Sequence, residues 1–267
     1  ALLRELYAPF GGDRLVTTPS TAEAIKYASN GLFATLISYA NEVASLCETV
    51  PGVDAAVVER GLHLDRRLRG SDGQPVGATS YLRSGCGFGG SCFPKDVKAL
   101  AAHGRDAGVA TPLLDAVLAV NAARVAAIVG QLQAVVGPLR GHTLTLWGLA
   151  FKPDTDDVRE SVSLRLAEAL LAVGARLRVH DPIVRPTHLS QQGYAALAEK
   201  MEWCTDPLTA SQGAAAVVLM TAWEEYRTFN LRQLPSTTSV FDGRRLWPME
   251  AAHPGRYFCL GKGPAVT

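Results

Sequence analysis

Several features that would assign this chain to a common functional class are missing from it. Its 26 lysines and arginines are balanced by 25 aspartates and glutamates, with no cationic run. Balanced, dispersed charge lacks the electrostatic footprint of a protein that binds nucleic acid or anionic membranes. The N-terminus lacks the cationic start, apolar segment and cleavage site of a signal peptide, and no apolar stretch approaches the roughly 20 residues of a membrane span. We therefore expect a cytoplasmic protein with neither nucleic acid nor membrane as a partner.

Cysteine is also too sparse to organise the fold. The chain has five cysteines and no CxxC pair, at positions Cys47, Cys86, Cys92, Cys204 and Cys259. An odd, widely spaced set predicts neither a disulfide framework nor a zinc site. We expect free thiols and no metal site.

The chain does contain enough apolar residues, 48% of 267, to bury at least one core. Its first half has helical periodicity. A strand-like run at 15–18 precedes a helix that Ser20 should cap, with Glu23 closing a capping box, and that should extend to about Cys47. Further helices are predicted at 53–62, 94–103 and 113–136, with a loop at 66–77. The last of these helices is so apolar that we expect a second domain or a partner subunit to cover it.

After Gly137 the pattern changes to alternating strands and helices. Strands are predicted at 143–149, 176–180, 215–220 and 239–242, and a helix at 161–173 that Gly174 caps. Such βα alternation is typical of a parallel sheet. The predicted fold class is therefore α/β: an all-helical central domain with a long connecting helix at 19–138, then a Rossmann-like domain at 139–267.

The most informative segment is GFGGSCFPKD, from Gly87 to Asp96. Its glycines allow the backbone to approach a ligand closely, and Pro94 is well suited to the first turn of a helix. Cys92 should then lie at the positive end of that helix, where the thiolate of a nucleophilic cysteine is favoured. Asp96 falls in the first helical turn, within reach of a water or a base. An inert buried thiol after a glycine turn is the alternative for a single cysteine.

Three other segments carry candidate ligand-binding residues. Lys26 and Asn30 lie four residues apart on one helical face, where both can point at an oxyanion. Lys152 and Arg159, in GLAFKPDTDDVRES, follow a strand and precede a helix, the usual place for phosphates in open α/β sheets. Arg244, in FDGRR, could bind a diphosphate or a carboxylate by bidentate hydrogen bonds. Each of these cations could also be an ordinary solvated side chain.

These segments, together with AEAIKYASN at 22–30, occur in an order that resembles the UDP-glucose/GDP-mannose dehydrogenase family, and the resemblance covers essentially the whole chain. It implies an NAD-dependent, four-electron oxidation of the C6 alcohol of a nucleotide sugar, with UDP-glucose as the first candidate. Cys92 would form a thiohemiacetal and then a thioester, with Lys26, Asn30 and Asp96 assisting. The family's sites also imply two sets of binding residues. Substrate would be bound by Lys26, Asn30, Tyr81, Arg83, Phe88, Gly89, Phe151, Lys152 and Arg244, and cofactor would be bordered by Cys92, Lys95 and Arg159.

Two departures from the family pattern bear on function. The family's N-terminal NAD-binding domain, with its dinucleotide-binding loop, has no counterpart in these residues, so the resemblance implies that 1–18 is the end of that missing domain and that this chain alone would be inactive. Pro75 stands where many relatives carry an arginine that enters the neighbouring subunit, leaving Arg69 or Arg83 as substitutes. A homodimer through the helical domain is expected. The sequence leaves open a GDP-mannose or UDP-N-acetylhexosamine substrate, and a non-catalytic module for sugar-nucleotide binding or dimerisation.

Overall fold

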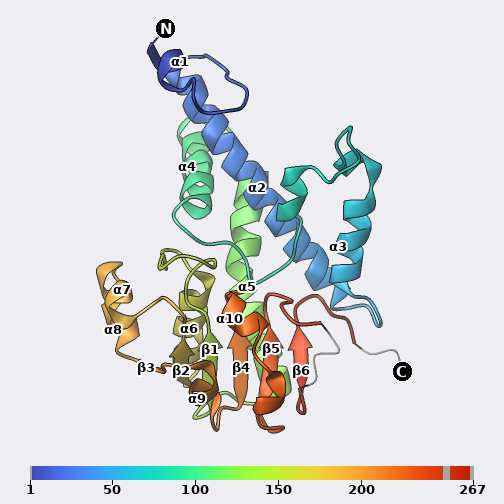
Figure 1. Cartoon of the computed structure of the whole chain (residues 1–267), viewed down its shortest axis with the longest axis vertical. Helices are drawn as coiled ribbons and strands as arrows, with labels where there is room; N and C mark the ends of the chain where they lie inside the picture. Colours follow the sequence, from blue (N-terminus) through green and yellow to red (C-terminus); the bar gives the residue numbers. More distant parts are fainter. Residues whose placement is uncertain (1, 249–252, 265–267) are drawn as a thin grey trace.

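The molecule has a helical part and a sheet-containing part joined by one long helix. The structure, a computed structural model, describes residues 2–248 and 253–264. Figure 1 shows helices α1 to α5 above, a six-stranded sheet with the remaining helices below, and α5 extending from the first part into the second. This arrangement confirms the predicted fold class.

The helical part contains five α-helices and two short 3-10 helices, of which the periodicity predicts α2 to α5 but neither α1 nor the 3-10 helices. Their bounds are α1 Leu2–Leu6, α2 Pro19–Cys47, α3 Ala55–Leu64, η1 Arg66–Leu68, η2 Gly77–Tyr81, α4 Phe93–Asp106 and α5 Pro112–Val136. Two local predictions are wrong. Residues 15–18 form no strand, and α2 is capped by Thr18, whose hydroxyl accepts a hydrogen bond from the Thr21 amide, rather than by Ser20. The second error places the helix start two residues late, because hydroxyl residues flank Pro19 on both sides.

Helix α5 has about the predicted length, and this chain alone covers little of it. It packs against α2, α4 and α6, yet only 22% of its most apolar window is buried. By length and composition it is also long and apolar enough to cross a membrane, so the sequence-based statement that no stretch approaches a span is wrong. The side that faces the protein carries Asn121 and Arg124, both buried, which indicates packing against polar groups of the chain.

The second part is built on a parallel sheet of six strands. The strands are β1 Thr143–Trp147, β2 Arg176–His180, β3 Met201–Trp203, β4 Ala216–Leu219, β5 Ser239–Asp242 and β6 Tyr257–Cys259, in the order β3-β2-β1-β4-β5-β6. The connecting helices are α6 Val162–Ala172, α7 Pro186–Gln191, α8 Ala195–Ala198, α9 Pro207–Ser211, α10 Glu224–Arg227 and the 3-10 helix η3 Leu231–Gln233. This is the strand order of a doubly wound nucleotide-binding sheet. It places the reversal of order between β1 and β4, with all carboxyl ends at one edge.

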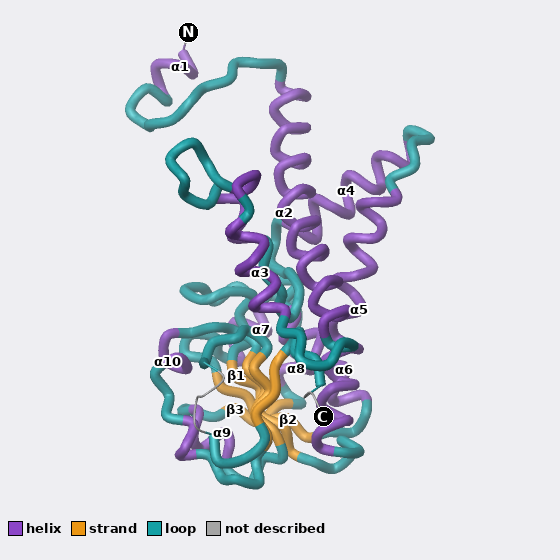
Figure 2. The backbone as a smooth tube through the Cα atoms, turned by 90° about the vertical axis from the view of Figure 1, so that its right-hand side faces the viewer, coloured by secondary structure: helices purple, strands orange, loops and turns teal. Residues whose placement is uncertain are grey.

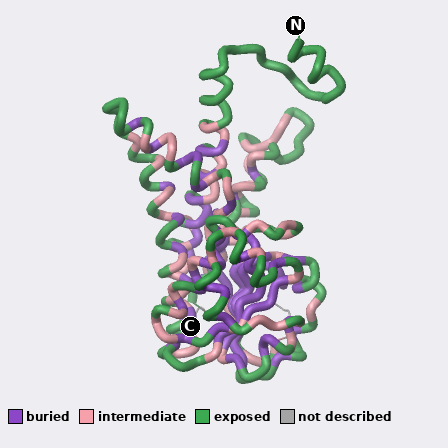
Figure 3. Tube along the Cα trace, turned by 90° about the vertical axis from the view of Figure 1, so that its left-hand side faces the viewer, coloured by how far each residue is buried: buried purple, intermediate pink, exposed green. Residues whose placement is uncertain are grey.

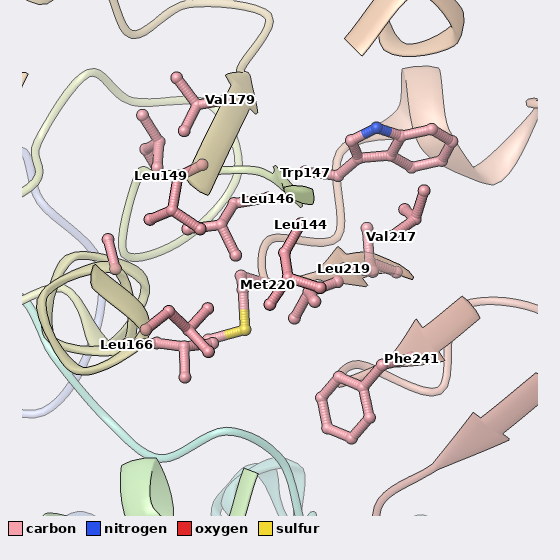
Figure 4. Close-up of a cluster of buried hydrophobic side chains, with 14 of the residues drawn as sticks. Leu144, Leu146, Trp147, Leu149, Leu166, Val179, Val217, Leu219, Met220 and Phe241 are labelled. Atoms are coloured by element: carbon pink, nitrogen blue, oxygen red, sulfur yellow. The ribbon is translucent and has the colours of Figure 1, made fainter. Parts of the chain in front are cut away.

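The main hydrophobic core lies in and around this sheet. Figure 4 shows Trp147, Leu146 and Phe241 among the side chains that fill it. Trp147 stacks on Tyr226 with ring centroids 5.1 Å apart. In Figure 3 the sheet is buried while the N-terminal segment and the first turns of α2 are exposed.

The end of the described chain returns to the helical part and ties the two parts together. The Ala55 amide donates to Gly261 and the Gly263 amide to Val53, both at 2.8 Å. Arg245, beyond β5, pairs with Asp54, the N-cap of α3, at 2.8 Å. In Figure 2 the sheet lies directly below α2, α3 and α5. The carboxyl ends of β5 and β6 face the helical part, because Arg245 and Gly261, which follow these strands, make those contacts.

Candidate functional site

Cys92 lies where the sequence places it, immediately before helix α4. It is the N-cap residue of this 14-residue helix, and Pro94 is in the first turn. The thiol is exposed and lies 3.8 Å from the Ser91 hydroxyl. An exposed thiol at a helix N-terminus is accessible to a reacting group.

Asp96 gathers three other predicted residues around it. Its carboxylate, 3% exposed, accepts a hydrogen bond from Asn30 Nδ2 at 2.6 Å and another from Lys95, and lies 3.6 Å from Lys26 Nζ. Burial alone would raise the pKa of Asp96, but the hydrogen bonds from Lys95 and Asn30 and the charges of both lysines outweigh burial and lower it. Lys26 and Asn30 are thus held on one face of α2, beside the start of α4.

The glycine-rich loop before Cys92 is fixed by two asparagines that sequence reasoning missed. Asn121 accepts from the Phe88 amide at 2.8 Å and donates to the Phe88 carbonyl at 3.0 Å. Asn41 accepts from the Gly85 amide at 2.7 Å. The signal in the sequence was Asn121, an asparagine within the otherwise apolar helix α5. Because both backbone groups of Phe88 are occupied, this residue can shape a ligand site by packing rather than by hydrogen bonding.

The far end of the same loop contacts the second part of the molecule. The Gly90 amide donates to the Arg159 carbonyl at 3.0 Å. A Cβ on Gly89 would lie 2.3 Å from the Glu160 carbonyl oxygen, and one on Gly90 would lie 2.8 Å from the Phe151 ring. No side chain larger than hydrogen fits at Gly89, so these two glycines allow the predicted loops to meet.

Three predicted substrate residues line one cavity of about 260 Å³ between the two parts. Tyr81 and Arg83 come from the helical part, and Arg244 comes from the turn after β5. Tyr81 stacks on Phe33 with ring centroids 4.3 Å apart, which fixes its ring. Two guanidinium groups at a small cavity beside the carboxyl edge of the sheet suit a phosphate-bearing ligand.

Lys152 and Arg159 lie on the long loop after β1. The Lys152 ammonium is 5.5 Å from the centre of the Phe151 ring. Arg159 forms a two-bond ion pair with Asp157, at 2.9 and 2.8 Å, which raises the pKa of Arg159. Lys95, likewise, is paired with Asp96. The two cations expected at the cofactor are therefore partnered within the chain.

Among the residues that the structure describes, no three histidine, cysteine, aspartate or glutamate side chains are grouped to hold a metal ion.

Comparison with known proteins agrees with this geometry. The UDP-glucose/GDP-mannose dehydrogenase family model for the central domain matches residues 20–123, and the model for the UDP binding domain matches 145–249. Together they cover most of the chain, which therefore belongs to this family.

Individual relatives point the same way. The UDP-glucose 6-dehydrogenase TuaD of Bacillus subtilis is 36% identical over 100% of this chain and 55% of its own length. The UDP-glucose 6-dehydrogenase of Pseudomonas aeruginosa is 39% identical over 92% of this chain and 53% of its own length. A solved UDP-glucose dehydrogenase from Pyrobaculum islandicum superposes with a TM-score of 0.81 at 35% identity, over 96% of this chain and 54% of that one. The chain thus spans about half the length of the curated relatives it matches.

Proposed function

We propose that this chain carries the sugar-nucleotide side of an NAD-dependent nucleotide-sugar 6-dehydrogenase, with UDP-glucose as substrate. The observation that carries the proposal is the exposed Cys92 thiol at the start of α4, beside the cluster of Lys26, Asn30 and Asp96. The proposed division of the chain is an N-terminal segment at 1–18, a helical domain at 19–138 and a sugar-nucleotide domain at 139–267.

In this proposal the hexose C6 alcohol loses two hydrides and gains one oxygen from water. NAD, when bound, supplies the hydride acceptor. The Cys92 thiolate adds to the C6 aldehyde, forming a carbon–sulfur bond and an oxyanion that Lys26 and Asn30 stabilise. Loss of the second hydride gives a thioester, which water hydrolyses to the carboxylate and the free thiol.

Asp96 was expected to act on a water or to orient a base, and its contacts favour a positioning role over that of a base. A lowered pKa makes a carboxylate a weaker base, and this one already accepts hydrogen bonds from Asn30 and Lys95. We therefore assign Asp96 to holding Lys26 and Asn30 in position rather than to deprotonating water. Lys95 and Arg159 would meet the cofactor only by exchanging their present carboxylate partners.

For the substrate, Arg83 and Arg244 would bind the diphosphate, Tyr81 would pack beside them, and Lys152 would reach it from the β1 loop. Phe88, Gly89 and Phe151 would shape the site by packing. UDP is favoured over GDP by the names of the relatives, which are UDP-glucose 6-dehydrogenases. GDP-mannose or a UDP-N-acetylhexosamine is the alternative substrate, and a non-catalytic binding module is the alternative class.

The proposal predicts calorimetric binding of UDP-glucose and no heat from NAD alone. Lys152→Ala should weaken UDP-glucose binding by about tenfold or more, because a charged hydrogen bond to phosphate is lost. Lys200→Ala, which removes the same charge from an exposed position between α8 and β3, should leave it unchanged. Tighter binding of GDP-mannose or UDP-N-acetylglucosamine would reassign the substrate, and no sugar-nucleotide binding would contradict the proposal.

We also propose a homodimer through the helical domain. Ile25, Leu32, Tyr39 and Leu46 are exposed and recur every seven residues along α2, and the neighbouring α5 is poorly covered. A seven-residue apolar repeat presents one continuous stripe to another helix. Light scattering at micromolar concentration should give twice the mass of the chain, and the mass of a single chain would overturn the proposal.

A further inference from the structure

Two buried aspartates stand behind the loops that present the predicted cations. Asp181 follows β2 and Asp242 ends β5, so both lie at the carboxyl edge of the sheet. They are 3% and 0% exposed and line none of the cavity that Arg83 and Arg244 share. Neither residue was among the candidates that the sequence offered.

Asp181 accepts five hydrogen bonds from N–H groups. One oxygen accepts from the Leu149 and Ala150 amides at 2.7 and 3.2 Å and from the Trp223 indole at 3.2 Å. The other oxygen accepts from the Ile183 and Val184 amides. Leu149 and Ala150 directly precede Phe151 and Lys152, so this carboxylate fixes the start of the loop that carries them.

The carbonyl groups at the start of that loop are fixed as well. The Ser161 hydroxyl donates to the Leu149 carbonyl and the Thr221 hydroxyl to the Ala150 carbonyl, both at 2.7 Å. The path of the loop is therefore determined before any ligand arrives.

Asp242 fixes the turn after β5 as Asp181 fixes the loop after β1, by accepting hydrogen bonds. It accepts from the Arg244 amide at 3.0 Å, from the Leu246 and Trp247 amides at 2.8 and 3.1 Å, and from the Tyr257 hydroxyl at 2.7 Å. Arg245, in the middle of this turn, has a φ of +52°, which a non-glycine residue keeps only when its surroundings hold it. The carboxylate thereby sets the direction in which Arg244 leaves the backbone.

We propose that Asp181 and Asp242 are positioning residues of the sugar-nucleotide site, which hold the loops of Lys152 and Arg244 without touching the ligand. The inference rests on the proposed function. A loop ordered in advance spares the ligand the entropic cost of ordering it. An acceptor-only group is needed, because an asparagine amide would direct an NH₂ group at N–H donors and leave some of them unpaired.

Replacing each aspartate with asparagine distinguishes a positioning role from an effect of the negative charge. A buried negative charge near a diphosphate opposes binding, so a purely electrostatic role predicts tighter UDP binding once the charge is removed. A positioning role predicts weaker UDP binding. Asp181→Asn and Asp242→Asn should each raise the Kd for UDP by about tenfold or more, measured by calorimetry well below the unfolding temperature.

Asp206→Asn is the matched control. Asp206 also caps its own segment by accepting the Thr209 amide, but on α9, which carries no predicted site residue. Its Kd for UDP should stay near that of the unsubstituted chain. Should Asp181→Asn not fold, Thr221→Val removes a single bond to the same loop and should weaken UDP binding in the same direction.

The outcomes are distinguishable. A lowered unfolding temperature with an unchanged Kd, or tighter UDP binding, would overturn the positioning role alone. No UDP binding by the unsubstituted chain would overturn the proposed function, and this inference with it.

Discussion

Gly148→Ala should destabilise the chain by about 3 kcal/mol or more, as the sum of backbone strain and overpacking. Gly148 follows β1 with a φ of +92°, and a Cβ there would lie 2.4 Å from Thr221 Cβ and 2.8 Å from the Thr221 amide nitrogen. Both atoms belong to Thr221, which is buried, so nothing flexible can move aside. The change in the free energy of unfolding can be measured by urea denaturation.

Gly108→Ala provides the control, because Gly108 also has a positive φ, +71°, but nothing lies within 4 Å of its Cβ position. It should cost only about 1 kcal/mol. Equal losses in the free energy of unfolding would show that contact with Thr221 adds nothing to the cost of a Cβ at position 148.

Iodoacetamide at neutral pH should modify Cys92 before any other thiol. Cys92 is exposed at a helix N-terminus, whereas Cys47, Cys86 and Cys259 are buried and Cys204 is partly buried. Burial is the main cause that raises the pKa of all four, that of Cys259 to about 11, and the thiolate is the reactive form. Mass spectrometry should therefore find one rapidly added group per chain.

Cys92→Ser should abolish the fast labelling, and Cys204→Ser should leave it intact. Rapid labelling at a different cysteine would contradict the assignment of Cys92 as the accessible nucleophile. Slow labelling of Cys92 itself would favour the non-catalytic alternative.

Regular, strongly patterned elements were predictable from the sequence. The strands at 176–180 and 239–242 have the predicted ends, and Cys92 precedes a helix as expected, because alternation and a proline in the first turn are local signals. The edge strands β3 and β6 were missed. Each is three residues long and is defined by its neighbour rather than by its own pattern.

The residues that support the site could not be predicted, since their partners are distant in sequence. Asn121 holds Phe88 across 33 residues, and Asp181 holds Leu149 across 32. A single sequence contains no signal for such contacts. For α5 the composition predicts that the helix needs cover, but it does not indicate what provides that cover.

Protection of Cys92 by UDP-glucose is the measurement that tests the central claim most directly, because it asks whether the nucleophile and the sugar-nucleotide site are one place. If they are, saturating UDP-glucose should slow the labelling of Cys92 by iodoacetamide, and Lys152→Ala should require more ligand for the same protection. Labelling that proceeds at the same rate while calorimetry shows UDP-glucose bound would place Cys92 outside the site and contradict the account.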